Sequence, residues 1–196
     1  DYSQIELRVM AHLSGDDNMI EAFREGYDIH AATAAKIYKE TIDSVTRDQR
    51  TKAKRANFGI IYGITVFGLA ERLEISRDEA KQLIDGYFQT FPKVQLYMEA
   101  AKETARQKGY AETFFHRRRY LPDINSGNAT VRNFAERNAI NAPIQGSAAD
   151  IIKIAMIRIH EQFHMKRLRS KMILQVHDEL NFSVVPEERD IVEQIV

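Results

Sequence analysis

The sequence contains no cysteine, and only four of its 196 residues are proline. Without cysteine the chain forms no disulfide, no thiolate metal site and no cysteine nucleophile, and it fits a reducing compartment. It has no run of 18 apolar residues, so we expect no membrane-spanning helix. The opening DYSQIELRVM also lacks the basic region and apolar stretch of a secretory signal peptide. The scarcity of proline favours a mainly helical chain.

The chain also lacks any excess of charge, because 28 basic residues balance 28 acidic ones. Zero net charge excludes a uniformly basic coat for nucleic acid, but it permits local patches. Basic residues gather at 47–55, 117–119 and 166–171, whereas acidic residues concentrate in the first forty and last twenty positions. We therefore expect separated patches of opposite charge.

Length and composition indicate a single domain or a large piece of one, since 44% of the 196 residues are apolar. The chain begins without methionine and ends with RDIVEQIV, inside an amphipathic helical pattern. We therefore expect a fragment truncated at both ends.

Capping residues followed by helical spacing of apolar residues mark the starts of several helices. They predict helices that begin after Asp28, Thr46 and Ser76 and at Pro92 and Pro186, and a long helix over 128–163 bent at Pro143. Short apolar runs predict two hairpins, at 110–121 and 172–185, and the end of a strand at 2–7 that leads into a helix ending near Gly15. The fold class is therefore α+β and mainly helical.

The predicted helix over 47–63 carries two cations and two aromatic rings four residues apart: Arg50, Lys54, Phe58 and Tyr62. Each step of four residues turns a helix by about 400°, so the four side chains share one broad face. Cations bind phosphates and aromatic rings stack on a base or sugar, which suits a nucleoside triphosphate. The same pattern also fits an exposed basic turn followed by two core aromatics.

Carboxylates stand at the two ends of the chain, Asp1 in the predicted strand and Asp178 with Glu179 in the turn of QVHDEL. Two carboxylates can hold two Mg²⁺ ions about 3.5–4 Å apart, an arrangement that serves in-line phosphoryl transfer. The alternative is that Asp178 and Glu179 are ordinary turn residues. His30 and His177 have no zinc-site spacing and, taken alone, are typical surface or core residues.

Three segments resemble motifs of the family-A DNA polymerases, in that family's order. DYSQIELR resembles motif A, RTKAKRANFGIIYG motif B and QVHDEL motif C; INAPIQGSAADIIK and GYAETFFHRRRYLPDI are similar too, so the resemblance covers essentially the whole chain. It implies fingers helices packed on part of an antiparallel palm sheet. The implied parts are palm at 1–15 (motif A strand and following helix), fingers at 16–125 with the motif B helix at 47–63, and palm at 126–196 with the motif C hairpin and final helix.

The resemblance also implies a role for each matching residue. Asp1 and Asp178, with the backbone carbonyl of Tyr2, would bind two Mg²⁺ ions, and Glu179 would be a nearby acid with a secondary catalytic role. The nucleotide would be held by Arg50 and the catalytic Lys54 on its triphosphate, Phe58 at its sugar, Tyr62 near the nascent base pair, Glu6 as the gate against a ribose 2′-hydroxyl, and Gln4 and His30. Template or primer would be contacted by Arg137, Asn141, Gln145 and His177.

The function implied by the resemblance is template-directed DNA synthesis, by two-metal nucleotidyl transfer from dNTP to a primer 3′-hydroxyl. The parent would be a longer, monomeric, cytoplasmic polymerase that binds primer–template DNA and dNTP but no membrane. Two alternatives are a single-subunit RNA polymerase, against which Glu6 and Phe58 argue, and a non-catalytic DNA-binding fragment. One departure is His116, at a position where family members often carry glycine, which leaves the local turn geometry open.

Overall fold

The computed structural model describes residues 4–196, which are mainly helical with two small antiparallel sheets. Its α-helices are α1 (Ile5–Ser14), α2 (Asp17–Arg24), α3 (Ile29–Tyr38), α4 (Arg47–Ile61), α5 (Val66–Leu73), α6 (Arg77–Thr90), α7 (Pro92–Lys108), α8 (Ala129–Met165) and α9 (Arg189–Ile195). Two short 3₁₀ helices cover Ile42–Ser44 and Pro186–Glu188. The strands are β1 (Tyr110–Glu112), β2 (Arg118–Tyr120), β3 (Lys171–Val176) and β4 (Glu179–Ser183). The predicted α+β, mainly helical fold is confirmed.

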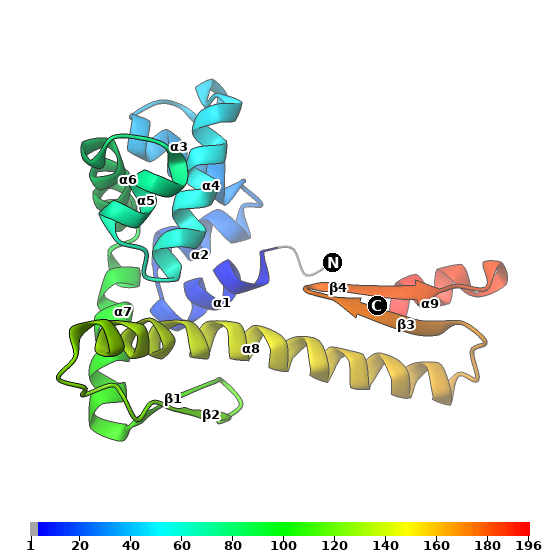
Figure 1. Cartoon of the computed structure of the whole chain (residues 1–196). Helices are drawn as coiled ribbons and strands as arrows, with labels where there is room; N and C mark the ends of the chain where they lie inside the picture. The colour runs from blue at the N-terminus through cyan, green and yellow to red at the C-terminus, as the bar shows by residue number, and fades with distance from the viewer. Residues whose placement is uncertain (1–3) are drawn as a thin grey trace.

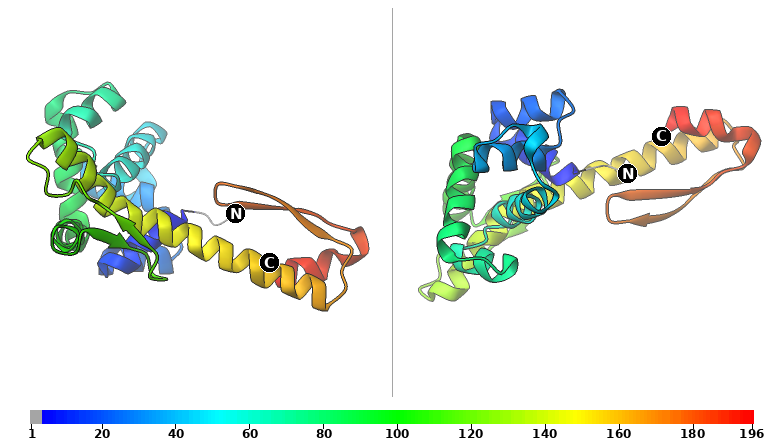
Figure 2. Two further views of the ribbon diagram at one scale, coloured as in Figure 1. Left: turned by 60° about the horizontal axis from the view of Figure 1, so that its bottom comes forward. Right: turned by 90° about the horizontal axis from the view of Figure 1, so that it is seen from above.

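Helices α1 to α7 gather around one half of α8, whose other half extends away from them (Figures 1 and 2). At 37 residues, α8 is roughly 55 Å long. Strands β3 and β4 form a hairpin beside the far half of α8, and Val176 pairs with Glu179 next to its turn. Strands β1 and β2 form the second hairpin, in which Tyr110 pairs with Tyr120. Among residues 4–196, no helix combines the length and apolar character needed to cross a membrane.

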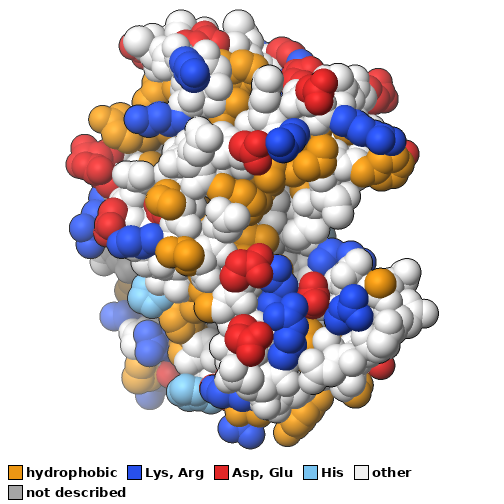
Figure 3. Space-filling model, turned by 90° about the vertical axis from the view of Figure 1, so that its left-hand side faces the viewer, with side chains coloured by type: hydrophobic (Ala, Val, Ile, Leu, Met, Phe, Trp, Pro, Cys, Tyr) orange, Lys and Arg blue, Asp and Glu red, His pale blue; other side chains and the backbone are white. Residues whose placement is uncertain are grey.

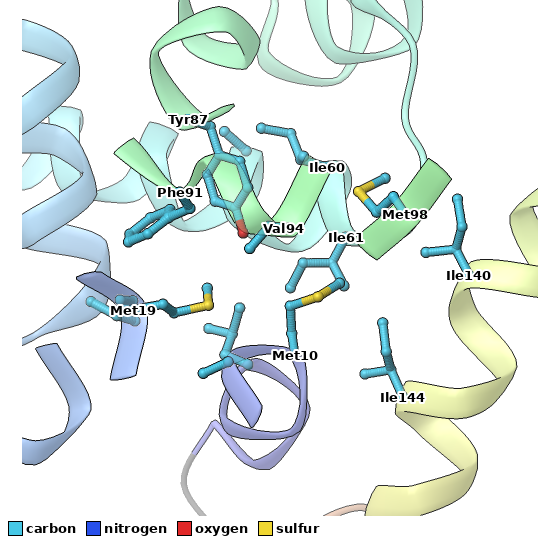
Figure 4. Packing of buried hydrophobic residues seen from close by; sticks show 14 of the residues in the cluster. Met10, Met19, Ile60, Ile61, Tyr87, Phe91, Val94, Met98, Ile140 and Ile144 are labelled. Carbon is cyan, nitrogen blue, oxygen red and sulfur yellow. The ribbon is translucent and has the colours of Figure 1, made fainter. Parts of the chain in front are cut away.

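The main hydrophobic core lies where α1, α2, α4, α7 and α8 meet (Figure 4). Met10 of α1, Met19 of α2 and Ile61 of α4 are fully buried there, together with Val94 of α7 and Ile144 of α8. Burial of such side chains is worth about 1.5–3 kcal/mol each. The core therefore fixes α1 and α4 against the middle of α8, and this arrangement positions the candidate site.

The predicted strand over 2–7 is wrong in its described part, because Ile5–Leu7 form the first turn of α1. Ile5 and Leu7 are buried as expected, but Val9 and Met10 are buried with them at helical spacing. Three apolar positions in alternation cannot distinguish a short strand from the start of a helix. Positions 2 and 3 of the predicted strand lie outside the described residues.

The capping signals predicted the longer helices correctly. The Asp28 side chain caps α3, Thr46 and Gln49 form a full capping box on α4, and Ser76 caps α6. Pro92 occupies the start of α7, as proline favours. Helices α2 and α5 were not predicted, since each has only eight residues and so little periodicity to detect.

The sequence raised a question of local geometry at two prolines and one histidine, and the structure departs from the expectation at Pro186. Helix α8 continues through Pro143 without a break in its helical assignment. Pro186 opens a short 3₁₀ helix, and α9 begins only at Arg189. His116 has a φ of 62°, in the left-handed region that favours glycine, and its Nδ1 lies 2.9 Å from a Glu112 carboxylate oxygen. The hairpin turn thus keeps a glycine-like backbone at His116.

Acidic and basic side chains are interleaved over the face shown in Figure 3, which is hollowed at one edge. Ion pairs between helices also bring opposite charges together, such as Lys93 with Asp17 at 2.6 Å and Arg106 with Glu136 at 2.8 Å. On this face the two signs of charge are mixed, and the separated patches expected from the sequence stay a prediction.

Asp16 joins two helix starts through one buried carboxylate. Its Oδ1 accepts from the Met19 N–H at 3.1 Å and caps α2, and its Oδ2 accepts from the Lys93 N–H at 3.0 Å at the start of α7. The side chain is 1% exposed. Since the first N–H groups of a helix have no partner within the helix, one residue satisfies donors of two helices.

Replacing Asp16 should therefore destabilise the core. We expect Asp16→Ala to lower the free energy of unfolding by about 2 kcal/mol, because two caps are lost at once. Asp16→Asn should lower the free energy of unfolding by less, since an amide keeps one oxygen acceptor. Urea unfolding followed by circular dichroism measures both, with the exposed Asp78→Ala in the first turn of α6 as control. Equal losses for Asp16→Ala and Asp78→Ala would contradict the double cap.

Candidate active-site cleft

An open cleft of about 510 Å³ lies where α1, α3, α4, α8 and the β3–β4 turn come together. It is lined by Gln4, Ile5, Glu6, His30, Arg50, Lys54, Phe58, Gln145, Ala148, Ala149, Ile152, Gln175, His177 and Asp178. Most of the described residues that the sequence predicted for nucleotide binding therefore share one cavity. A larger cleft of about 850 Å³ between α2, α3 and α6 contains none of the predicted residues.

One face of α4 forms a wall of the cleft because the other face is buried. Ala53, Ala56 and Ile60 are buried in or beside the core, which turns Arg50, Lys54 and Phe58 of the same helix toward the cavity. Phe58 is half-buried and its ring lies 5.8 Å from that of His30, centroid to centroid. The expected order of cations followed by an aromatic ring is thus present on one side of the cleft.

Arg50 is held in place by Asp28. The Arg50 Nε donates to the Asp28 carboxylate at 2.5 Å, and the same carboxylate accepts from the backbone N–H groups of His30 and Ala31. Burial raises the pKa of Asp28, but the hydrogen bonds from Arg50 and from the two N–H groups outweigh burial and leave the pKa lowered. Sequence analysis recognised Asp28 only as a cap and missed its ion pair with Arg50.

His30 is a neutral histidine at the edge of this cationic wall. Its side chain is 2% exposed, and burial, followed by the charges of Arg50 and Lys54, lowers its pKa to about 4 against the opposing effect of Asp28. At neutral pH the ring therefore accepts or donates hydrogen bonds without carrying charge.

Glu6 of α1, which lines the cleft, meets Tyr62, which follows the end of α4 and is outside the lining. The Tyr62 hydroxyl donates to a Glu6 carboxylate oxygen. Burial, the hydrogen bond to Glu6 and the Glu6 charge together raise the pKa of Tyr62 to about 12, while a hydrogen bond with Gln145 acts in the opposite direction. Tyr62 thus stays protonated and restrains the carboxylate of Glu6, although Tyr62 itself lies behind the cleft lining.

The turn of the β3–β4 hairpin brings the second predicted carboxylate into the cleft. His177 adopts a left-handed φ of 52°, and Asp178 follows it before β4 begins at Glu179. Asp178 lines the cleft and makes no hydrogen bond or ion pair with any other residue from 4 to 196, whereas Glu179 is exposed and outside the lining. Asp178 is therefore available to an added ligand.

Among residues 4–196, the cleft supplies one carboxylate without a protein partner as a possible metal ligand, that of Asp178. Residues 4–196 contain no group of three His, Cys, Asp or Glu side chains placed to hold a metal ion. The predicted ligands Asp1 and Tyr2 lie outside the described residues. Mg²⁺ is commonly bound by one or two carboxylates together with water and substrate phosphates, so the unpaired carboxylate of Asp178 has the right donor chemistry.

Two of the predicted DNA-contacting residues lie outside the cleft. Arg137 and Asn141 precede Gln145 by two turns and one turn of α8. Arg137 is exposed and lines a separate cavity of about 320 Å³, where its Cγ lies close to Gly63. Asn141 is half-buried, and its Oδ1 has no hydrogen-bond partner among residues 4–196. Only Gln145 and His177 of this set line the cleft.

The cleft also contains residues that sequence analysis did not single out: Ile5, Ala148, Ala149, Ile152 and Gln175. Helical spacing offered a signal for three of them. Ala148, Ala149 and Ile152 follow Gln145 by three, four and seven residues and so share its face of α8.

Comparison with known proteins identifies the class to which this fold and cleft belong. Residues 1–196 match the DNA polymerase family A model, and the chain belongs to that family. The family-A resemblance is thereby confirmed, and the single-subunit RNA polymerase alternative is not supported.

Individual relatives place the chain within bacterial polymerases. It is 55% identical to DNA polymerase I of Bacillus caldotenax over 97% of this chain, and 52% identical to that of Bacillus subtilis over all of it, in each case covering 22% of the relative. A solved POL domain of Pol1 from M. smegmatis, in complex with DNA primer-template and dNTP, matches the whole chain with a TM-score of 0.96 and 48% identity, over 34% of that structure. The chain thus spans about a fifth of the length of the curated relatives it matches.

The neutral His30 should make stability depend on pH. Because its pKa falls from 6.5 to about 4 on folding, the unfolded chain takes up a proton near pH 6.5 and the folded chain only near pH 4. The stability that the neutral His30 contributes to the folded chain is fully present above pH 6.5 and is lost as pH falls toward 4. In urea unfolding, we expect the free energy of unfolding of His30→Gln to fall less between pH 6.5 and pH 4 than that of the wild type. The exposed His160→Gln is the control, and an unchanged pH dependence in His30→Gln would show that His30 is not buried neutral.

Proposed function

We propose that this chain supplies the nucleotide-binding wall and one catalytic carboxylate of a DNA polymerase active site. The reaction is template-directed transfer of a nucleotide from dNTP to a primer 3′-hydroxyl, carried out by the longer polymerase. One observation carries the proposal: the 510 Å³ cleft has Arg50 and Lys54 from α4 and Asp178 from the β3–β4 turn in the same lining. Cations for phosphates and a free carboxylate for metal are what nucleotidyl transfer requires.

The cations of α4 bind the triphosphate. Arg50 uses its Nε for Asp28, so its two terminal nitrogens remain as donors for phosphate oxygens in a fixed orientation. Lys54 forms no ion pair within residues 4–196 and provides a mobile positive charge one turn further along. Together they offset negative charge that develops on the phosphates in the transition state. Gln4 and His30, which also line the cleft, help to orient the same group.

The sugar and base lie beyond the phosphates, against Phe58 and near Tyr62. Phe58 offers a flat apolar face for the sugar. Glu6, fixed by the Tyr62 hydroxyl, occupies the place where a ribose 2′-hydroxyl would have to fit. Because the hydrogen bond prevents Glu6 from swinging away, the gate favours deoxyribose. Such a gate suits a DNA polymerase, whereas an RNA polymerase must admit the ribose 2′-hydroxyl.

Asp178 and Asp1 would hold the divalent metal, with the Tyr2 carbonyl as a further ligand and Glu179 as a nearby acid. When bound, Mg²⁺ would lower the pKa of the attacking 3′-hydroxyl and stabilise the leaving pyrophosphate. The unpaired Asp178 side chain supports this assignment, and Asp1 stands three residues before Gln4, which lines the cleft.

Primer–template DNA is the second partner. Gln145 and His177 contact it from within the cleft, and Arg137 and Asn141 continue the contact along α8, which is long enough to follow a duplex. The residue ranges 1–15 and 126–196 form palm and 16–125 forms fingers in a monomeric, cytoplasmic polymerase. The solved relative bound to DNA primer-template and dNTP supports these two partners.

Loss of Lys54 should weaken triphosphate binding. We expect Lys54→Ala to reduce the affinity of the chain for a fluorescent dNTP about tenfold at low salt, because one charge-assisted contact is removed. Lys36→Ala, in the larger cleft, is the matched control and should bind as the wild type does. If both variants bind alike, Lys54 does not contact the phosphates.

Catalysis is tested by placing residues 1–196 in the corresponding region of a complete family-A polymerase. Primer extension should depend on Mg²⁺ and should fall by at least about 1000-fold in Asp178→Asn, since a metal ligand is lost while the shape is kept. Asp85→Asn, in the larger cleft, should retain activity. Undiminished extension by Asp178→Asn would favour the alternative in which this chain only grips DNA.

A further inference from the structure

Two fully buried polar side chains, Thr33 of α3 and Asn57 of α4, adjoin His30. The Asn57 Nδ2 lies 3.1 Å from the His30 Nδ1 and 3.1 Å from the Thr33 Oγ1. The Thr33 hydroxyl donates to the Ile29 carbonyl oxygen at 2.6 Å. These contacts link α3 to α4 immediately beside the cleft, one residue before Phe58.

The direction of each hydrogen bond follows from the number of hydrogens available. A threonine hydroxyl carries one hydrogen, and Thr33 uses it for Ile29, so toward Asn57 it can only accept. The Asn57 atom facing Thr33 is therefore the amide nitrogen, which carries two hydrogens. The second of these points to His30 Nδ1, which must accept. In a neutral imidazole whose Nδ1 accepts, the proton resides on Nε2.

Burying Asn57 costs free energy because one of its polar atoms has no partner within the described part of the chain. The role of Asn57 therefore lies in its contact with His30. The Asn57 Oδ1 is buried without a hydrogen-bond partner among residues 4–196. A buried, unpaired carbonyl oxygen costs about 1–3 kcal/mol, so an apolar residue at position 57 would avoid this loss of stability. What an apolar residue would not supply is a donor to His30.

We propose that Asn57, oriented by Thr33, is a positioning residue that holds His30 as the Nε2–H tautomer, so that a neutral N–H donor faces the nucleotide phosphates. The inference rests on the proposed function of the cleft, which His30 lines together with Arg50 and Lys54. The donor needs no charge of its own because two cations already stand beside it.

The charged groups around His30 favour this neutral state. Burial, Arg50 and Lys54 lower the pKa of His30 to about 4, and the Asp28 carboxylate, which opposes them, is already occupied by Arg50. A third positive charge in the cleft would have to be desolvated beside two others. The Asn57 donor reinforces the effect, since a protonated Nδ1 would meet an N–H group instead of an acceptor.

The tautomer can be observed directly by long-range ¹H–¹⁵N correlation of the chain labelled at histidine nitrogens. The wild type and Thr33→Ser should show His30 with an unprotonated Nδ1 at neutral pH. Thr33→Val removes the acceptor, frees the Asn57 amide to turn and should give a mixture of both tautomers. Thr90→Val is the matched control, because Thr90 makes the same hydroxyl bond to the carbonyl four residues earlier, at 2.8 Å, on α6. A protonated Nδ1 in the wild type, or a Thr33→Val spectrum like that of Thr33→Ser, would overturn the proposal.

The consequence for binding is tested with Asn57→Asp, which replaces the donor by an acceptor and favours a protonated His30. Its affinity for a fluorescent dNTP should rise on the order of fivefold as pH falls from 8 to 6, because hydrogen bonds from charged donors are stronger. The wild type should change much less. Nucleotide binding with equal pH dependence in both proteins would overturn the positioning role. Absence of nucleotide binding by the wild type would instead refute the proposed function, and the tautomer spectra would still decide the hydrogen-bond inference.

Discussion

The division of α4 into a buried face and a cleft-facing side is the constraint on which the site depends. Ala53, Ala56 and Ile60 are fully or almost fully buried, which fixes the rotation of the helix about its axis. With the rotation fixed, Arg50 and Lys54 must face the cavity, since residues four apart stay on one side of a helix. A polar residue at 53 or 60 would be costly to bury and would weaken this constraint on the direction in which Arg50 and Lys54 point. Core packing therefore specifies electrostatics in this protein.

The polar contacts between α3 and α4 add orientation to this packing. Asp28 fixes Arg50 at the start of α4, and Asn57 meets His30 and Thr33 two turns later. Each contact joins a residue in or capping α3 to a residue of α4, so these contacts hold the two helices together. A movement of α4 alone would break these contacts, so they favour a joint movement of α4 with α3 and His30.

Sequence reasoning predicted what depends on local pattern and missed what depends on contacts between distant residues. The caps at Asp28 and Thr46 are local features and were predicted, as was the spacing that places Arg50, Lys54 and Phe58, though not Tyr62, in the cleft lining. The Asp28–Arg50 and Tyr62–Glu6 contacts span 22 and 56 positions and leave no trace in periodicity. The strand predicted over 2–7 is wrong in its described part, because a short alternating run of apolar residues is too short to distinguish a strand from the first turn of a helix. Asp1 was noticed as a carboxylate at the end of a predicted strand, and the resemblance then favoured metal binding over an ordinary structural role.

Lys54 and Asp178 have opposite charges and no ion-pair partner among residues 4 to 196, which bears on the ligand proposed for the cleft. Lys54 and Asp178 line the same cavity, yet neither forms an ion pair with any residue from 4 to 196. Lys54 is exposed and Asp178 is half-buried, so water solvates both side chains and a direct ion pair between them would add little stability. A triphosphate with its metal carries both signs, anionic oxygens for the lysine and a cation for the carboxylate. Such a ligand satisfies both residues without bringing them together, whereas a simple anion or a simple cation would satisfy only one.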